Sequence, residues 1–323
     1  MEAVKEPEII TDKNQMRKWS RAMRCKGKTL ALVPTMGYLH QGHLSLVDEA
    51  RKHANLTVVS IYVNPGQFSP SEDLSTYPSD FRRDVLKLLS VPGGVDVVFH
   101  PYNLYDYKTD RRNVEEKEDN VDRSVGWRNL EGGGEVSCVE EKGTGHETWV
   151  RVERLEKGLC GKSRPVFFRG VATVVTKLFN IVEPDVAVFG KKDYQQWKII
   201  QRMVRDLDFS IRIIGSEVVR DNDGLAMSSR NVHLSVVERE KALSVSRSLF
   251  KAKLSTTEGC KSSKSLRDMI IQTIEEAGGK VDYVEIVEQE SLEAVDEIKN
   301  PVVVCVAAWF GKVRLIDNIE IDI

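Results

Sequence analysis

The chain contains few cysteines and no long apolar run, and each absence argues against a class of protein. The five cysteines among 323 residues are scattered, without a Cys-x-x-Cys pair or a histidine at zinc-ligand spacing, so they indicate reduced thiols. No apolar stretch approaches the length of a transmembrane helix. The first eight residues lack both the apolar core of a secretion signal and the Arg-rich character of a transit peptide. We expect a cytoplasmic (cytosolic) protein with no membrane partner.

Neither sign of charge is in large excess, because the formal net charge is -2. This gives no electrostatic reason to expect a nucleic acid as the main partner. A Gly-x-Gly-x-x-Gly run is also missing after the first apolar stretch, which argues against a dinucleotide-dependent oxidoreductase. A length of 323 residues favours two domains, or one large domain with additions.

Residues 34–43, Pro-Thr-Met-Gly-Tyr-Leu-His-Gln-Gly-His, form the first candidate site. They follow a short apolar run at 29–33 and precede residues 44–50, whose apolar positions fall at helical spacing, so they read as a strand-to-helix junction. The unpaired N–H groups and the dipole at the start of a helix favour phosphate as a ligand.

The glycines and histidines of this junction suit a nucleotide. Gly37 and Gly42 have no side chain to block a triphosphate, and His40 and His43 can point donors at oxygens that gain charge during reaction. The His-x-Gly-His spacing resembles the signature of class I nucleotidyl transferases. By itself it is equally compatible with two histidines that cap a helix.

A second apolar strand, residues 56–63, ends in Asn64-Pro65-Gly66-Gln67-Phe68. Ligands collect at the carboxyl ends of strands in open α/β sheets, so Asn64 and Gln67 stand where substrate residues are expected. Asn-Pro-Gly is also strong turn chemistry, and a simple turn remains the alternative.

A third junction follows the strand predicted at 185–189 and reads Gly190-Lys191-Lys192-Asp193-Tyr194-Gln195-Gln196. Lysine can neutralise phosphate, Asp193 can bind ribose hydroxyls or hold a cation, and glutamine can hydrogen-bond a small substrate. The alternative is a solvated start of a helix, where charged residues are common.

The run from Asp223 to Asn231 contains Met227-Ser228-Ser229-Arg230 after a turn at 221–224. Two hydroxyls beside an arginine suit a loop that closes over phosphates. A plain surface loop before the next helix is the alternative, because Ser235 and Glu238 have the form of a capping box.

Strand and helix patterns alternate over the first two thirds of the chain, as in a doubly wound parallel sheet. Besides the strands above, these patterns predict helices within 9–25, starting near residues 11–12, and at 80–89 and 170–182. They also predict strands at 95–99 and 210–215, and we place a domain boundary after the second of these, near Val218. The remainder predicts helices at 235–250 and 265–277 and strands at 281–287, 301–308 and 312–316.

The fold class is therefore α/β, with a Rossmann-like doubly wound parallel sheet and a smaller α+β C-terminal domain. We divide the chain into residues 1–218 and a C-terminal lid domain, 219–323, which carries the Met-Ser-Ser-Arg loop. Residues 107–145 interrupt the pattern with mixed charge and a triple glycine, which indicates a mobile insertion or a surface excursion.

Taken together and in order, the motifs resemble the pantothenate synthetase (pantoate:β-alanine ligase) family. The resemblance also takes in Phe168-Arg169-Gly170-Val171, Ala307-Ala308-Trp309 and Leu315-Ile316-Asp317-Asn318, so it spans nearly the whole chain. The charged insertion is absent from compact members and resembles plant forms.

The resemblance implies a two-step ligation with ATP and Mg²⁺. Pantoate would be activated as pantoyl adenylate with loss of pyrophosphate, and β-alanine would then form pantothenate and release AMP. It also implies a homodimer. Two departures from many bacterial members are Gly66 and Lys191, where methionine and glutamate are common.

The resemblance also implies roles for individual residues. The catalytic set would be His43 as proton donor, His40, Lys192, Ser228, Ser229 and Arg230. ATP would be bound by Met36, Gly37, His40, His43, Gly190, Lys191, Lys192, Asp193, Val219, Met227, Ser228, Ser229 and Arg230. Gln67 and Gln196 would bind pantoate, with Gln67 also close to β-alanine. The metal ligands stay unassigned.

Two rival functions remain at this point. One is another adenylate-forming or nucleotidyl-transfer enzyme of the same fold that acts on a different acid or phosphate. The other is a catalytically idle nucleotide sensor, which would be expected to lack His40, His43, Lys192 or Arg230, and all four are present.

Overall fold

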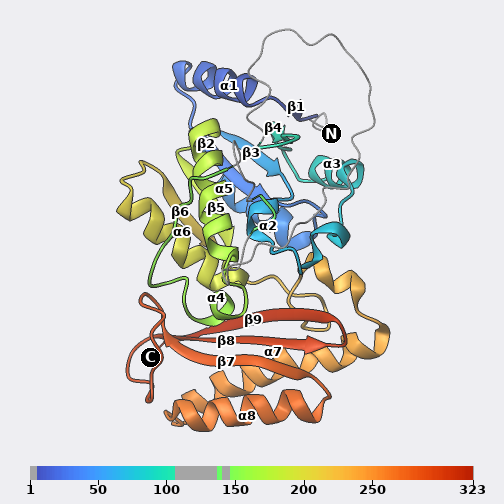
Figure 1. Ribbon diagram of the computed structural model, residues 1–323, viewed down its shortest axis with the longest axis vertical. Helices are drawn as coiled ribbons and strands as arrows, with labels where there is room; N and C mark the ends of the chain where they lie inside the picture. The colour runs from blue at the N-terminus through green and yellow to red at the C-terminus, as the bar shows by residue number, and fades with distance from the viewer. Residues whose placement is uncertain (1–5, 106–136, 140–145, 323) are drawn as a thin grey trace.

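The structure is a computed structural model that describes residues 6–105, 137–139 and 146–322. Apart from residues 137–139, the insertion predicted at 107–145 lies outside the described residues. The described chain forms two sheets, each with its own helices, and the second sheet lies below the first unit (Figure 1).

The first sheet has six strands in the order β1-β4-β3-β2-β5-β6, and every neighbouring pair is parallel. Parallel strands need crossover helices, so the phosphate-binding type of junction recurs at one edge of the sheet. The strands are β1 (Glu8–Ile10), β2 (Leu30–Thr35), β3 (Leu56–Ile61), β4 (Val97–Phe99), β5 (Val186–Gly190) and β6 (Arg212–Ser216).

Helices cover both faces of this sheet, which explains why its strands are apolar without alternation. Ala31 and Val33 of β2 pack in one core with α2 and α3, whereas Leu32 between them packs in another core with α5 and α6. The helices are α1 (Lys13–Cys25), α2 (Gln41–Arg51), α3 (Phe81–Leu89), α4 (Leu159–Ser163), α5 (Phe167–Val182) and α6 (Tyr194–Asp206).

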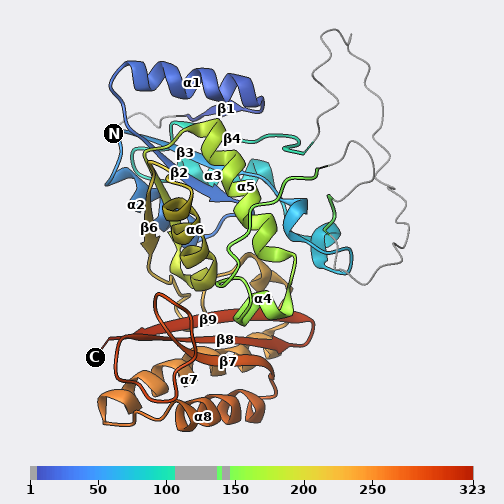
Figure 2. The ribbon, with the colours of Figure 1, turned by 60° about the vertical axis from the view of Figure 1, so that its left-hand side comes forward.

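The second sheet is antiparallel, with the order β7 (Lys280–Glu288), β8 (Val302–Phe310) and β9 (Val313–Ile321). Val302, Val304 and Val306 face the helices α7 (Val236–Thr257) and α8 (Ser263–Glu276). Val303 and Cys305 face the opposite way and join the core of the first unit. The sheet is therefore packed on both faces, and it lies close under α4 in both views (Figures 1 and 2).

The predicted fold class is confirmed, and most elements lie where the sequence places them. The helix predicted within 9–25 starts near residues 11–12 as expected, with Asp12 as its cap, whereas Ile9 and Ile10 before it belong to a strand, Glu8–Ile10, that pairs with β4. α7 and β9 run past the predicted ends, to Thr257 and Ile321. Within the described residues, no helix is long and apolar enough to cross a bilayer.

Candidate functional site

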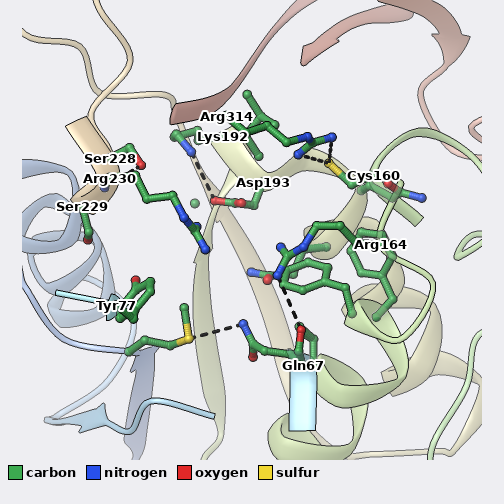
Figure 3. Close-up of a pocket in the computed structure, with 18 of the residues that line it drawn as sticks. Gln67, Tyr77, Cys160, Arg164, Lys192, Asp193, Ser228, Ser229, Arg230 and Arg314 are labelled. Carbon is green, nitrogen blue, oxygen red and sulfur yellow. Dashed lines mark hydrogen bonds and ion pairs between the residues drawn. The ribbon is translucent and has the colours of Figure 1, made fainter. Parts of the chain in front are cut away.

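A cleft of about 1130 Å³ lies between the carboxyl edge of the parallel sheet and the second sheet. Residues that follow β2, β3 and β5 line one side of it, and residues of β8 and β9 line another. The junctions that the sequence analysis singled out therefore converge on one cavity. Figure 3 shows part of this cleft, with Gln67, Lys192 and Arg230 directed into it.

The two histidines stand at the start of α2 with their rings in contact, at a centroid distance of 4.1 Å. The backbone N–H of His40 donates to Nδ1 of His43 over 3.3 Å, so the neutral His43 ring carries its hydrogen on Nε2. Nδ1 of His40 is buried and has no hydrogen-bond partner among the described residues. The capping role and the donor role are thus compatible, because capping uses only one nitrogen of His43.

Burial keeps both imidazoles neutral. It lowers the pKa of His40 to about 4, with Lys192 and Lys87 adding to the effect. Burial and the neighbouring His40 ring hold the pKa of His43 well below its usual value of 6.5. Near neutral pH each ring therefore acts as a hydrogen-bond donor and acceptor and carries no charge.

A buried carboxylate that the sequence analysis did not single out holds the loop before α2. Asp84 of α3 accepts hydrogen bonds from the backbone N–H groups of Tyr38 and Leu39, at 2.7 and 2.6 Å. Burial raises the pKa of Asp84. Nζ of Lys87 donates to the carbonyl oxygen of Leu39. No motif marks these residues, because their role depends on how α3 packs against the loop.

Gly37 shapes this loop and does not line the cleft, whereas Met36 does. Gly37 has a φ of +86°, and a Cβ there would lie 3.0 Å from Asp84 Oδ2. Gly37 therefore has a role in the turn, and its contact with ATP stays a prediction. Met36 stays in the cleft, with its Sδ 3.3 Å from Nε2 of Gln67.

A hydrogen-bond network fixes the side chain of Gln67. Asn64 Nδ2 donates to the Gly170 carbonyl at 3.1 Å, and Asn64 Oδ1 accepts from the Gly66 N–H at 3.2 Å. The same Nδ2 donates to Gln67 Oε1 at 2.9 Å. Because both backbone partners have fixed polarity, Gln67 must turn its NH₂ group toward the cleft.

The turn after β3 can form this network only because α5 comes very close to it. A Cβ on Gly170 would lie 2.1 Å from the carbonyl oxygen of Gly66. Tyr105 adds a further hydrogen bond, donating to Asn64 Oδ1 at 2.9 Å. The turn chemistry expected of Asn-Pro-Gly is present, since Pro65–Gln67 forms a 3₁₀ helix, η1, and it also serves the cleft.

The two adjacent lysines after β5 point to different places. Lys192 lines the cleft, with its Nζ 3.8 Å from Asp193 Oδ2. Nζ of Lys191 binds Glu217 and Glu320, each at 2.7 Å, and Lys191 does not line the cleft. The expectation that the Lys191 side chain contacts ATP is therefore not supported by its position.

The second sheet holds this turn in place. Asn318 of β9 donates through Nδ2 to the carbonyl oxygens of Lys191 and Lys192, at 2.9 and 2.8 Å. Gly190, Gln196 and Val219 also line the cleft. Gln195 instead donates to the backbone carbonyls of Leu155 and Gly158, so it supports the segment before α4.

The Met227-to-Arg230 segment reaches back to the first unit. Ser229 donates to the carbonyl oxygen of Tyr38 at 3.2 Å, and Ser228 caps the 3₁₀ helix η5 (Ser229–His233). Arg230 binds Asp73 through two hydrogen bonds, at 2.8 and 3.0 Å. Met227, Ser228, Ser229 and Arg230 all line the cleft. A carboxylate thus occupies the guanidinium fork that the prediction assigns to phosphate.

Tyr77 and Arg164 also line the cleft, and the sequence analysis assigned a role to neither. The guanidinium of Arg230 lies 5.4 Å from the centre of the Tyr77 ring. Arg164 is paired with Glu72. Their signal in the sequence is weak, because each stands outside the strand-to-helix junctions that draw attention to phosphate sites.

No group of three or more His, Cys, Asp or Glu side chains that could hold a metal ion occurs within the described ranges. Asp193 is the carboxylate beside Lys192, and Asp73 is occupied by Arg230. This donor set does not form a cage for a resident Mg²⁺. It suits an ion that arrives already bound to phosphate oxygens.

The arrangement brings neutral N–H donors, an ammonium and a guanidinium to one side of a cavity and an oriented amide to the other. Such groups can stabilise a polyanion and position a small polar acid beside it.

The comparisons with known proteins point to one family. A sequence model of the family described as pantoate-beta-alanine ligase matches residues 8–320. A pantoate-beta-alanine ligase of Lotus japonicus is 66% identical over 318 residues, which cover 98% of this chain and 99% of that protein.

Solved structures give the same result. A pantothenate synthetase of Thermus thermophilus superposes with a TM-score of 0.78 at 34% identity, over 97% of this chain and 99% of its own. A ligase from Francisella tularensis, described as complexed with beta-gamma ATP and beta-alanine, has a TM-score of 0.67 at 28% identity, over 97% of both chains.

Proposed function

The chain belongs to the pantoate-β-alanine ligase family, whose members form an amide bond, and we propose that it does so through an acyl adenylate made from ATP. In this proposal (R)-pantoate and β-alanine yield pantothenate, the vitamin B5 unit of coenzyme A, with release of AMP and pyrophosphate. The family match favours this reaction over nucleotidyl transfer to a different acid.

In the first step an oxygen of the pantoate carboxylate attacks the α-phosphorus of ATP, and the bond to the β-phosphate oxygen breaks. Charge grows on the α-phosphoryl oxygens and on the departing pyrophosphate. The donor set around the start of α2 supports this step, since Lys192 and the histidines converge where that charge would lie.

Neutral histidines fit the role of hydrogen-bond donors better than that of proton donors in this step. The His43 ring already accepts at Nδ1 from the His40 backbone, which leaves Nε2–H for a phosphoryl oxygen. Arg230 would leave Asp73 for the phosphates, since a phosphate offers the same bidentate geometry with more charge. Ser228, Ser229 and Met227 would follow it in the same loop.

In the second step the amine of β-alanine attacks the acyl carbon, the bond to the AMP oxygen breaks, and the amine loses a proton. Gln67 and Gln196 would hold the pantoyl group, and Gly190, Asp193 and Val219 the nucleoside. No step requires a covalent bond to the protein, so positioning supplies most of the acceleration.

Residues 219–323 act as a lid domain in this proposal, because their loop and β9 complete the nucleotide side of the cleft. Mg²⁺ would enter with ATP, and the assembly would be a homodimer in the cytosol. The observation that carries the proposal is the convergence of three separate strand-end motifs on one cleft in a chain that matches the family from end to end.

The test is exchange of labelled pyrophosphate into ATP with Mg²⁺ and pantoate but without β-alanine. Exchange that requires pantoate, followed by AMP release when β-alanine is added, is the expected result. Exchange without pantoate, or AMP release only when all three substrates are present with no exchange beforehand, would contradict the two-step order.

A further inference from the structure

Arg164 is a cation of the cleft to which the proposed first step gives no task. In the proposed function Lys192 and Arg230 meet the nucleotide and Gln67 holds the acyl group. Arg164 lies beside Gln67 in the cleft (Figure 3). Its Nη2 is 3.5 Å from the carbonyl oxygen of Gln67. A positive group in this place is available to a second anion.

The guanidinium of Arg164 is held in a fixed plane. Its Nε donates to Glu72, and Oε2 of Glu72 is itself held by the Ser69 N–H at 2.8 Å. The Phe167 ring covers one face of the guanidinium at 3.9 Å from its central carbon. Only 15% of the Arg164 side chain is exposed. A planar cation fixed in this way is preorganised for a carboxylate.

One edge of this guanidinium is open. Glu72 occupies the Nε side, and the Gln67 carbonyl is at the limit of hydrogen-bond distance from Nη2. Within the described part of the chain, Nη1 has no hydrogen-bond partner. The edge formed by Nη1 and Nη2 can therefore accept a two-oxygen ligand.

Arg314, another arginine that lines the cleft, is differently placed. Its Nε and Nη2 both bind Asp282, the Nη2 contact being 2.6 Å, and its Nη groups lie 3.6 and 3.7 Å from Cys160 Sγ. Like Arg164 it is paired with one carboxylate, but both of its Nη groups are turned toward Cys160. It serves as a natural control for Arg164.

We propose that the Nη1–Nη2 edge of Arg164 binds the carboxylate of the amino-acid substrate and so selects an amine that carries an acid group at its far end. The inference rests on the proposed function. The amine end of such a substrate would face the acyl carbon beside Gln67, and its carboxylate, two methylenes away, would reach the Arg164 edge. The nucleotide half of the reaction does not involve this edge.

The experiment compares two amines in wild-type protein, Arg164→Gln and Arg164→Lys. The amines are β-alanine and 3-aminopropanamide, which has the same length and a neutral amide in place of the carboxylate. Both half-reactions are measured: pantoate-dependent pyrophosphate exchange, and AMP release from preformed adenylate after addition of the amine.

Wild-type protein should prefer β-alanine by about 100-fold or more in kcat/KM, because a site built for a charged hydrogen bond rejects a ligand that lacks it. In Arg164→Gln, kcat/KM should fall about 100-fold for β-alanine and less than about 3-fold for the amide. The rate of pyrophosphate exchange should stay within about 3-fold of wild type. Arg164→Lys should fall in between, because it keeps the charge and loses the fork.

Arg314→Gln is the matched control. It should leave the ratio of kcat/KM for β-alanine to kcat/KM for the amide within about 3-fold of wild type. The ratio cancels any loss of folded protein, so a merely structural role of Arg164 would lower both amines equally and overturn the inference. A loss of exchange in Arg164→Gln would also overturn it and place Arg164 with the acid or nucleotide. Absence of exchange in wild-type protein would instead refute the proposed function.

Discussion

Two groups of residues in the cleft differ in how many of their polar atoms form hydrogen bonds within the protein. In the histidine cluster, which we define as His40, His43 and Lys192, Nδ1 of His40 has no described partner and Lys192 has only a 3.8 Å contact with Asp193. In the glutamine cluster, Asn64 and Gln67, the Asn64 amide is bonded on both sides and Oε1 of Gln67 is held.

The difference fits the charge that each cluster would meet. Groups that stabilise charge developing in a transition state must keep donors free until it appears. Groups that orient a small acid are most useful when they are already fixed. The histidine cluster is therefore expected to act on the rate of adenylation, and the glutamine cluster on the binding of the acid.

The largest effect is expected from Lys192→Ala. Loss of a charged donor at the phosphates should lower pyrophosphate exchange by about two orders of magnitude or more, and His43→Ala should have a similar effect. Circular dichroism and thermal melting would check that the fold is kept.

Lys191→Ala is the matched control for this prediction, because the neighbouring lysine is bound by Glu217 and Glu320 and does not itself line the cleft. Exchange should stay within about 3-fold of wild type. Equal losses in both variants would show that the two lysines are not divided as the structure places them.

A smaller effect is expected from Asn64→Ala in the glutamine cluster. The substitution frees the Gln67 amide to rotate and leaves the Gly170 carbonyl without its donor, so kcat/KM for pantoate should fall about tenfold. The KM for ATP should change little. Steady-state kinetics with each substrate varied in turn would measure both, and a loss confined to ATP would contradict the assignment.

The pH dependence sharpens the comparison further. The pKa of His40 is lowered to about 4 and that of His43 well below 6.5, so both rings are neutral between about pH 6 and 8 and exchange should show no inflection near 6.5. Activity should fall only as the pH drops toward 4 and the rings gain protons. A pH profile of kcat/KM with a midpoint between 6 and 7 that disappears in His40→Asn would contradict this view.

The same shifts set the sign of a stability effect. Since the unfolded chain binds more protons than the folded chain below about pH 6.5, the histidines lower the free energy of unfolding as the pH falls from that value. Denaturant unfolding of wild type and His40→Gln at pH 7 and pH 5 would show it as a smaller pH effect in the variant.

The smallest effect is expected away from the cleft, at the start of α7. Ser235 and Glu238 form the capping box that the sequence predicts. Ser235→Ala should lower the free energy of unfolding by about 1 kcal/mol and leave both half-reactions unchanged. Denaturant unfolding measures the stability, and the exchange assay with AMP release measures the two half-reactions. A change in the exchange rate would contradict the prediction and show that the start of α7 affects adenylation.

Much of the site could be predicted from sequence because its main residues follow buried strands. The apolar runs of β2, β3 and β5 are visible by eye, and His43, Gln67 and Lys192 come directly after them. The parallel sheet then brings these ends together without further information.

Other parts could not be predicted, for physical reasons. β1 is three residues long and becomes a strand only by pairing with β4. Asp84 and Arg164 reach the site through the packing of α3 and of the segment before α5, which no local pattern encodes. The different positions of the Lys191 and Lys192 side chains depend on Glu217 and Glu320, which are distant in sequence from each other.

The central claim is that the carboxylate of pantoate is activated as an adenylate in this cleft. The most direct measurement is the fate of ¹⁸O in pantoate labelled at its carboxylate during one turnover with ATP and β-alanine. If the adenylate forms, mass spectrometry will find one labelled oxygen in AMP and the other in the amide of the product. Label in pyrophosphate or orthophosphate, or AMP without label, would contradict the account.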